Sequence, residues 1–162
     1  MSLKILKAEA DDFSAIWEFF SLIVKQGDTV SFSPDITYDK AKKFWMQHDH
    51  YVYKAMLEGA IIGTYVIRAI DPGPASHVAN GIYMVHPDFQ GKKIGFQMVS
   101  HSLREAKSKG FKAMQFDRVV CTNIPAVKLY QKLGFKIIGT LPKVFNHKKL
   151  GFVDAYVMHR FL

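Results

Sequence analysis

Residues 77–110 constrain the fold of this chain more than any other stretch, because an apolar run, a glycine-bearing turn and an amphipathic segment follow one another there. Residues 82–85 predict a strand, which the His-Pro-Asp sequence at 86–88 interrupts. The stretch Gln-Gly-Lys-Lys-Ile-Gly at 90–95 then leads into a predicted helix, whose apolar residues recur every three or four positions before Gly110. The first turn of such a helix has free N–H groups and a partial positive charge, so the pattern indicates a phosphate-binding turn. An ordinary tight turn with solvated lysines is the alternative.

A second motif follows the next predicted strand, at residues 123–135, and it reads Asn-Ile-Pro-Ala-Val-Lys-Leu-Tyr-Gln-Lys-Leu-Gly-Phe. The ordered pair of motifs resembles the GCN5-related N-acetyltransferase (GNAT) superfamily, and the resemblance covers nearly the whole chain. In that superfamily the acyl-CoA loop reads Gln/Arg-x-x-Gly-x-Gly/Ala, and the later motif reads Asn-x-x-Ala-x-x-Leu-Tyr-x-x-x-Gly-Phe. The loop matches at Gln90 and Gly95 but has Lys93 where the family usually has glycine. The later motif matches at Asn123, Ala126, Leu129, Tyr130, Gly134 and Phe135.

The remaining patterns predict an α/β fold in a single domain over residues 1–162. We expect a mixed, twisted sheet of about six or seven strands with about four flanking helices. The predicted strands are 3–8, 51–57, 60–70, 76–85, 112–120, 135–141 and 151–160. The predicted helices run from about 12 to 26, from 37 or 39 to about 47, from about 95 to 110 and from 123 to 133, and residues 28–37 and 143–150 are predicted loops. The GNAT resemblance implies that the sheet splays open at the acetyl-CoA site, between the strands that end at Val85 and near Val120.

Composition narrows the class of protein. Hydrophobic residues make up 49% of the chain, enough for a core without disulfide bonds, and the single cysteine excludes an internal disulfide. Two early aspartates argue against a signal peptide, and no apolar run is long enough to cross a membrane, so we expect a soluble, cytoplasmic protein. The net charge of +8 is spread over many lysines, which favours attraction for CoA or a plain basic surface over nucleic-acid binding. His48 and His50 only superficially resemble a metal pair, so no metal is expected.

The resemblance implies where acetyl-CoA binds. The backbone of the strand before the turn is expected to hold the pantetheine arm, the turn and the first residues of the helix to hold the pyrophosphate, and Asn123 to contact the cofactor or a bound water. Lys93 is bulkier than the glycine usual there, although its charge could offset the lost room. The cofactor-binding candidates are Tyr83, Met84, Val85, Gln90, Gly91, Lys92, Lys93, Ile94, Gly95, Phe96, Asn123, Ala126 and Tyr130.

The resemblance also implies catalytic and substrate-binding residues. Tyr130 occupies the family's usual position for the acid that protonates the leaving thiolate, with packing on the helix as the alternative role. Many members place a glutamate base on one of the splayed strands, and none is evident here. Asp117 is the nearest carboxylate, and it could accept a proton directly, act through water, bind a cationic amine or pair with Arg118. Asn80 is a substrate-binding candidate, and so is Phe32, whose alternative role is packing under a loop.

The resemblance implies an N-acetyltransferase that moves an acetyl group from acetyl-CoA directly to an amine of a small molecule or amino acid. A protein or peptide N-acetyltransferase is one alternative, and a closed acceptor pocket walled by residues 28–37 would argue against it. A non-catalytic acyl-CoA-binding module is another, suggested by Lys93 and the missing glutamate. Several positions, Asn80 and Asn123 among them, resemble the acetyltransferases that act on proline analogues such as azetidine-2-carboxylate, with Asp117 as a departure. The closing strand and residues 143–150 are candidates for a homodimer contact.

Overall fold

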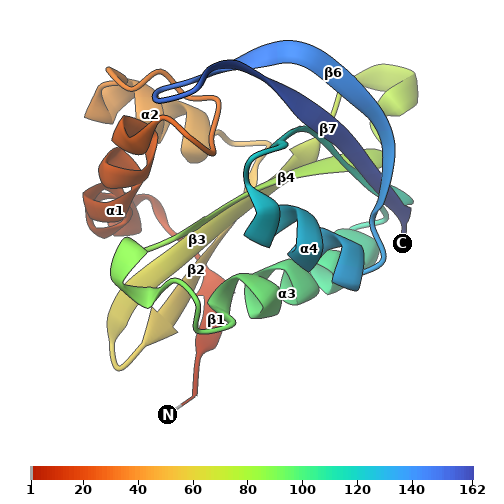
Figure 1. The fold of residues 1–162 in the computed structure, drawn as a ribbon. Helices are drawn as coiled ribbons and strands as arrows, with labels where there is room; N and C mark the ends of the chain where they lie inside the picture. The colour runs from red at the N-terminus through yellow and green to blue at the C-terminus, as the bar shows by residue number, and fades with distance from the viewer. Residues whose placement is uncertain (1) are drawn as a thin grey trace.

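A computed structural model describes residues 2–162, which form a seven-stranded sheet between two layers of helices (Figure 1). The strand order is β1-β2-β3-β4-β5-β7-β6, with β4 and β5 parallel and all other neighbours antiparallel, so the prediction of an α/β fold with a mixed sheet is confirmed. The strands are β1 (Lys4–Lys7), β2 (Tyr51–Leu57), β3 (Ala60–Ala69), β4 (Val78–Val85), β5 (Ala113–Val120), β6 (Lys136–His147) and β7 (Gly151–Phe161). The helices are α1 (Phe13–Gln26), α2 (Tyr38–Trp45), α3 (Ile94–Ser108) and α4 (Ile124–Lys132). Three short 3-10 turns lie at Ala10–Asp12, Gly73–Ala75 and Pro87–Phe89.

Helices α1 and α2 cover one face of the sheet. The apolar face of α1 packs against α2 and the inward-facing residues of β3 and β4, Val66 and Met84, in a core rich in aromatic rings. Trp45, at the end of α2, is fully buried and donates its indole N–H to the hydroxyl of Thr64 on β3 at 3.1 Å. This hydrogen bond satisfies the one polar group of the indole, so the largest side chain of the core fixes α2 against the sheet.

Helices α3 and α4 cover the other face, where a row of tyrosines crosses the sheet. Tyr53, Tyr65 and Tyr83 lie opposite one another on β2, β3 and β4, and their rings are 4.9 Å and 5.5 Å apart. Each phenol hydroxyl meets a polar side chain of α3: Glu105 for Tyr53, His101 for Tyr65 and Ser102 for Tyr83. Because buried hydroxyls need partners, these pairs set the position of α3 over the sheet.

The hairpin of β6 and β7 differs from the expectation at one point. Residues 143–150 were predicted to be a loop, whereas β6 continues through His147 and only the three residues before Gly151 form the turn. Pro142 and the neighbouring lysines favour a loop in the sequence, but β6 is the edge strand of the sheet, where proline is tolerated. A bulge absorbs the irregularity, because residues 142–144 of β6 face a single residue of β7 and Asp154 accepts the N–H of Lys143 at 2.9 Å.

Candidate active site

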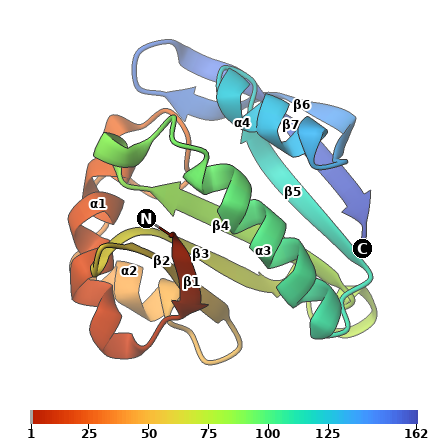
Figure 2. The same cartoon turned by 90° about the horizontal axis from the view of Figure 1, so that it is seen from below.

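The site begins where β4 and β5 part. The two strands pair only at Val78 with Ala113 and at Ala79 with Met114, and beyond these pairs β4 stays with β3 while β5 stays with β7 (Figure 2). Asn80 marks the point of separation, where its side-chain amide donates to the carbonyl oxygen of Gln115 at 2.9 Å. The backbone groups of β4 that face β5 therefore lack a strand partner after this residue, which is the splay that the resemblance implied.

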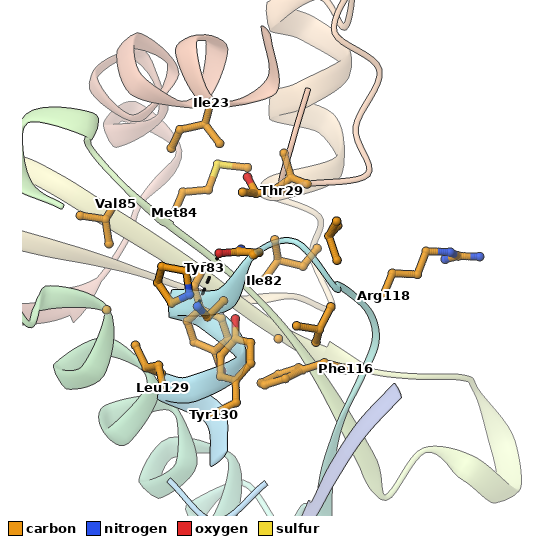
Figure 3. Close-up of a pocket in the computed structure, with 18 of the residues that line it drawn as sticks. Ile23, Thr29, Ile82, Tyr83, Met84, Val85, Phe116, Arg118, Leu129 and Tyr130 are labelled. Atoms are coloured by element: carbon orange, nitrogen blue, oxygen red, sulfur yellow. Dashed lines mark hydrogen bonds between the residues drawn. The ribbon is translucent and has the colours of Figure 1, made fainter. Parts of the chain in front are cut away.

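A cavity of about 980 Å³ occupies this gap. One end lies at the turn before α3 and along one side of α4, and the other reaches the loop between α1 and α2 at residues 29–32. The rings of Tyr83, Phe116 and Tyr130 gather in the middle, as the close-up shows (Figure 3). A single space thus connects an electropositive turn with a second pocket across the sheet.

The turn before α3 has an unusual backbone conformation. Gly91 has a φ of 78°, and Lys93, the residue that caps α3, has a φ of 61°, so two nearby residues adopt the left-handed conformation. Glycine adopts this conformation without strain, which explains why the family usually has glycine at the position of Lys93. Gln90 donates its side-chain amide to the carbonyl of Val85 at 3.4 Å and so ties the turn to the end of β4.

Positive charge surrounds this end of the cavity. Lys93 lines it from the turn, and Lys128 and Lys132 line it from α4, one helical turn apart on the same side. The ammonium of Lys132 lies 5.5 Å from the centre of the Phe96 ring on α3. Together with the partial positive charge of the α3 N-terminus, these lysines suit an anionic ligand such as a phosphate.

Tyr130 is held in the middle of the cavity by α4. Asn123 begins this helix, and its side-chain oxygen accepts the N–H of Ala126 at 3.4 Å, so the capping role considered for Asn123 is present. The Tyr130 ring packs 4.5 Å from the ring of Phe116 and 6.4 Å from that of Tyr83. Burial raises the pKa of the Tyr130 phenol above its usual value, so the hydroxyl keeps its proton near neutral pH.

A bulge in β5 shapes the opposite wall. Phe116 pairs with Met158 and Val119 with Tyr156, so two residues of β5, Asp117 and Arg118, face one residue of β7. One oxygen of the Asp117 carboxylate accepts the side-chain amide of Gln115 at 2.9 Å, and the ion pairs formed by residues 2–162 do not join Asp117 to Arg118. Arg118 extends away from Tyr130 (Figure 3). Asp117 is the only carboxylate among the lining residues of the described chain.

Aromatic side chains form the wall at the far end. Phe32, in the loop after α1, lines the cavity and also packs 5.2 Å from Phe20 and 5.3 Å from Phe44, so both roles considered for it are present. The start of this loop is anchored by the turn of the β6–β7 hairpin, where the N–H of Lys148 donates to the carbonyl of Gly27 at 3.0 Å. Figure 1 shows the hairpin reaching over to this loop. The loop that forms this wall is therefore held at its start by the hairpin and at Phe32 by aromatic packing.

The structure brings together almost all of the residues that the sequence singled out. Asn80, Phe32, Asp117 and every cofactor-binding candidate except one line the cavity. The exception is Lys92, whose ammonium lies instead 5.0 Å from the centre of the Phe89 ring and outside the cavity lining. Several other lining residues were not predicted from the sequence: Phe44, Arg68, Phe116, Lys128 and Lys132. The sequence signals for them were the charge of Arg68 near the end of an apolar strand and the helical spacing of Lys128 and Lys132.

The described residues offer neither a metal-binding cluster nor a membrane-spanning helix. Within residues 2–162, no group of three or more histidine, cysteine, aspartate or glutamate side chains could hold a metal ion, and His50 packs its ring against Phe44 instead. Over the same described range, every helix is too short or too polar to span a bilayer.

The parted parallel strands, the turn before α3 and the partly buried tyrosine of α4 are the arrangement that the resemblance to acyltransferases implied. The family model "Acetyltransferase (GNAT) family" matches residues 13–135, and the chain belongs to this family. It is a GNAT acetyltransferase.

Three known proteins are similar to this chain. The solved structure of a GCN5-related N-acetyltransferase from Kribbella flavida is 37% identical, with a TM-score of 0.94, and the match covers 99% of this chain and 98% of that one. The N-acetyltransferase aca1 of Schizosaccharomyces pombe is 29% identical over 97% of this chain and 68% of its own length. The L-amino acid N-acetyltransferase AaaT of Escherichia coli is 32% identical over 65% of both chains.

Proposed function

We propose that the chain transfers the acetyl group of acetyl-CoA directly to an amine nitrogen of a small molecule or amino acid. The observation that carries this proposal is the single cavity between β4 and β5, which joins the lysine-rich turn, the partly buried Tyr130 phenol and the space walled by residues 29–32. Direct transfer between two substrates requires that both bind at the same time, one on each side of a shared proton donor. Family membership supports acetyl-CoA as the donor.

The residues present suit acetyl-CoA at one end. Lys93, Lys128 and Lys132 with the α3 N-terminus would hold the phosphates, and a side chain added at Gly91 would meet no atom within 4 Å, so the turn leaves room for a bulky anion. The unpartnered backbone of β4 beyond Asn80 would hold the amide-bearing arm as an added strand would. Acetyl-CoA supplies a thioester carbonyl that an amine can attack, with a thiolate as the leaving group.

The chain's own residues would manage the protons. The Tyr130 phenol is protonated near neutral pH, and its place in the middle of the cavity would let it hand that proton to a thiolate formed beside it. Asp117 is the lining carboxylate, and its second oxygen can accept a hydrogen bond from the acceptor amine. The side-chain oxygen of Asn80 can do the same, because only its amide nitrogen is used by Gln115.

The walled acceptor pocket favours a small acceptor over a protein chain. Residues 29–32 line the cavity, and the loop that they form is anchored by Lys148 at its start and by the contacts of Phe32 with Phe20 and Phe44. The name of the Escherichia coli relative supports amino acids as acceptors. Proline analogues such as azetidine-2-carboxylate are a narrower candidate class, on the resemblance at Asn80 and Asn123.

Thiol release from acetyl-CoA across a panel of amines, amino acids and proline analogues tests the proposal. We expect turnover with one class of small amine and none with peptides of mixed sequence. Tight acetyl-CoA binding without turnover on any acceptor would instead indicate the non-catalytic binding module. Absence of both binding and turnover would contradict the assignment of the cavity.

A further inference from the structure

Arg68 lies near the end of β3, on the same side of the sheet as the acceptor pocket. It lines the cavity and pairs in register with Asn80 of β4. Residues directly opposite in an antiparallel pair point to the same face, and side chains two positions apart along a strand share a face. The pair two positions away, Val66 with Ile82, belongs to the core beneath α1 and α2. Arg68 therefore shares the face on which Asn80 bridges the parted strands.

The guanidinium of Arg68 has no anionic partner in the described chain. Its Nε is buried and makes no hydrogen bond, and the ion pairs formed by residues 2–162 do not include it. Its central carbon lies 5.4 Å from the centre of the Phe44 ring, so the flat face of the group is supported by an aromatic ring. A partly buried guanidinium with an unused donor is costly unless something outside the chain supplies the acceptor.

The neighbouring histidine does not duplicate this charge. His50 packs 5.2 Å from the Phe44 ring, and its side chain is only 3% exposed. Burial lowers the pKa of His50; Asp49 opposes this shift, and the charge of Arg68 adds to it. His50 is therefore neutral near pH 7, and Arg68 carries the only permanent charge of the cluster formed by Phe32, Phe44, His50 and Arg68.

We propose that Arg68 binds the carboxylate of the acceptor, so that the acceptor is an amino acid held at both of its charged groups. This inference rests on the proposed function and narrows its substrate class. The carboxylate and amide oxygens of Asp117 and Asn80 would take the amine, while the planar fork of Arg68 takes the carboxylate through paired hydrogen bonds. Side chains directly opposite on an antiparallel pair start about 4.5–5.5 Å apart, so one α-amino acid can reach both Arg68 and Asn80.

The phosphates of acetyl-CoA do not account for Arg68. Asn80, its neighbour, lies five residues before Val85 along β4, which corresponds to about 17 Å of extended strand before the turn that precedes α3. Lys93, Lys128 and Lys132 already supply positive charge at that turn. The charge of Arg68 thus belongs to the acceptor end.

The test compares one amino acid with its own α-carboxamide, which keeps the shape and removes the negative charge. The test uses the amino acid that gives the highest kcat/KM in the panel. A carboxamide also changes the basicity of the amine. The readout is therefore the ratio of kcat/KM for the acid to kcat/KM for the amide, compared between the wild-type protein and each variant. Arg68→Met is expected to lower kcat/KM for the acid about 10- to 100-fold, the worth of a charge-assisted hydrogen-bond pair, and to leave the amide nearly unchanged. Arg104→Met, at an exposed arginine of α3, is the matched control and should keep the wild-type ratio.

The outcomes separate this inference from the proposed function. Equal losses for acid and amide in Arg68→Met, or a wild-type enzyme that acetylates amines without a carboxylate equally well, would overturn the carboxylate role and leave the N-acetyltransferase standing. Absence of turnover with every acceptor would remove both. If Arg68→Met does not fold, as judged by thermal unfolding and acetyl-CoA binding, Arg68→Lys serves instead. It keeps the charge without the planar fork and should lower the same ratio by a smaller factor.

Discussion

Asn80 donates its side-chain amide to the backbone carbonyl of Gln115 at 2.9 Å, one residue beyond the last paired residues of β4 and β5. A side chain thus takes over from the backbone ladder at the point where the two strands separate. The bond satisfies a carbonyl that would otherwise have no strand partner, and it fixes the closed end of the gap.

We expect Asn80→Ala to lower the free energy of unfolding by about 1–3 kcal/mol, because it leaves the partly buried Gln115 carbonyl without its donor. Urea unfolding measures this change. Asn80→Asp is the matched variant, since it keeps a side-chain oxygen for the acceptor but cannot donate while ionised, and it should be destabilised as well. Wild-type stability in both variants would show that this hydrogen bond does not hold the strands.

Tyr130→Phe should lower kcat by about 100- to 10,000-fold, the usual contribution of a positioned acid, because the variant keeps the packed ring but has no proton to give. Calorimetry should find acetyl-CoA affinity little changed. Tyr51→Phe, at an exposed tyrosine of β2, is the control and should retain wild-type turnover. Unchanged turnover in Tyr130→Phe would remove the proposed acid role of this residue.

Replacement of Lys93 by glycine should raise the free energy of unfolding by about 1 kcal/mol, because the φ of 61° strains any residue that has a Cβ. The adjacent Lys92 has no such strain, so Lys92→Gly removes the same charge and should destabilise the protein slightly. Thermal unfolding of the two variants side by side separates strain from charge. A destabilised Lys93→Gly would show that the lysine side chain itself supports the turn.

The unfolding free energy should fall as the pH drops below about 6.5, the usual value for histidine. Burial lowers the pKa of both His50 and His101; for His101, Glu105 opposes the shift and Arg104 adds to it. Below about pH 6.5 the unfolded chain therefore binds protons at these histidines that the folded chain does not bind. The loss of stability continues until the pH falls below the lowered pKa values of the folded state.

Urea titrations between pH 5 and 8 test this dependence. His101→Gln should flatten the curve, whereas His48→Gln, at an exposed histidine, should not. His101 also forms a hydrogen bond of 2.7 Å with the Tyr65 hydroxyl, so its replacement should lower stability at every pH. A wild-type curve without slope between pH 5 and 6.5 would contradict the prediction.

Much of the architecture could be predicted from the sequence, because the apolar periods of the strands and helices are regular. The motifs at residues 90–95 and 123–135 predicted one end of the cavity and the tyrosine in its middle. The strand after Leu141 was missed because Pro142 and the lysines around it are typical of a loop, and only the pairing of β6 with β7 shows that an edge bulge accommodates them. Local residue preferences do not contain this long-range pairing.

The acceptor end was less predictable for a physical reason. Arg68 follows an apolar run and resembles any solvated charge at the end of a strand. Its significance lies in a buried nitrogen without a partner and in the Phe44 ring beneath it, and both depend on distant segments that fold together. Asp117 was expected near the cleft from the sequence and does line the cavity, but the bulge that sets its position is not evident from the sequence.

The most direct test of the account is the identity of the product. Wild-type protein is incubated with acetyl-CoA and the best acceptor of the panel, and the acetylated amine and the free thiol are counted by mass spectrometry and by thiol titration. We expect one N-acetylated product for each thiol released, with both yields strongly reduced in Tyr130→Phe. Thiol release without an acetylated amine would show that the cavity hydrolyses the thioester, and it would contradict the proposal that this protein acetylates amines.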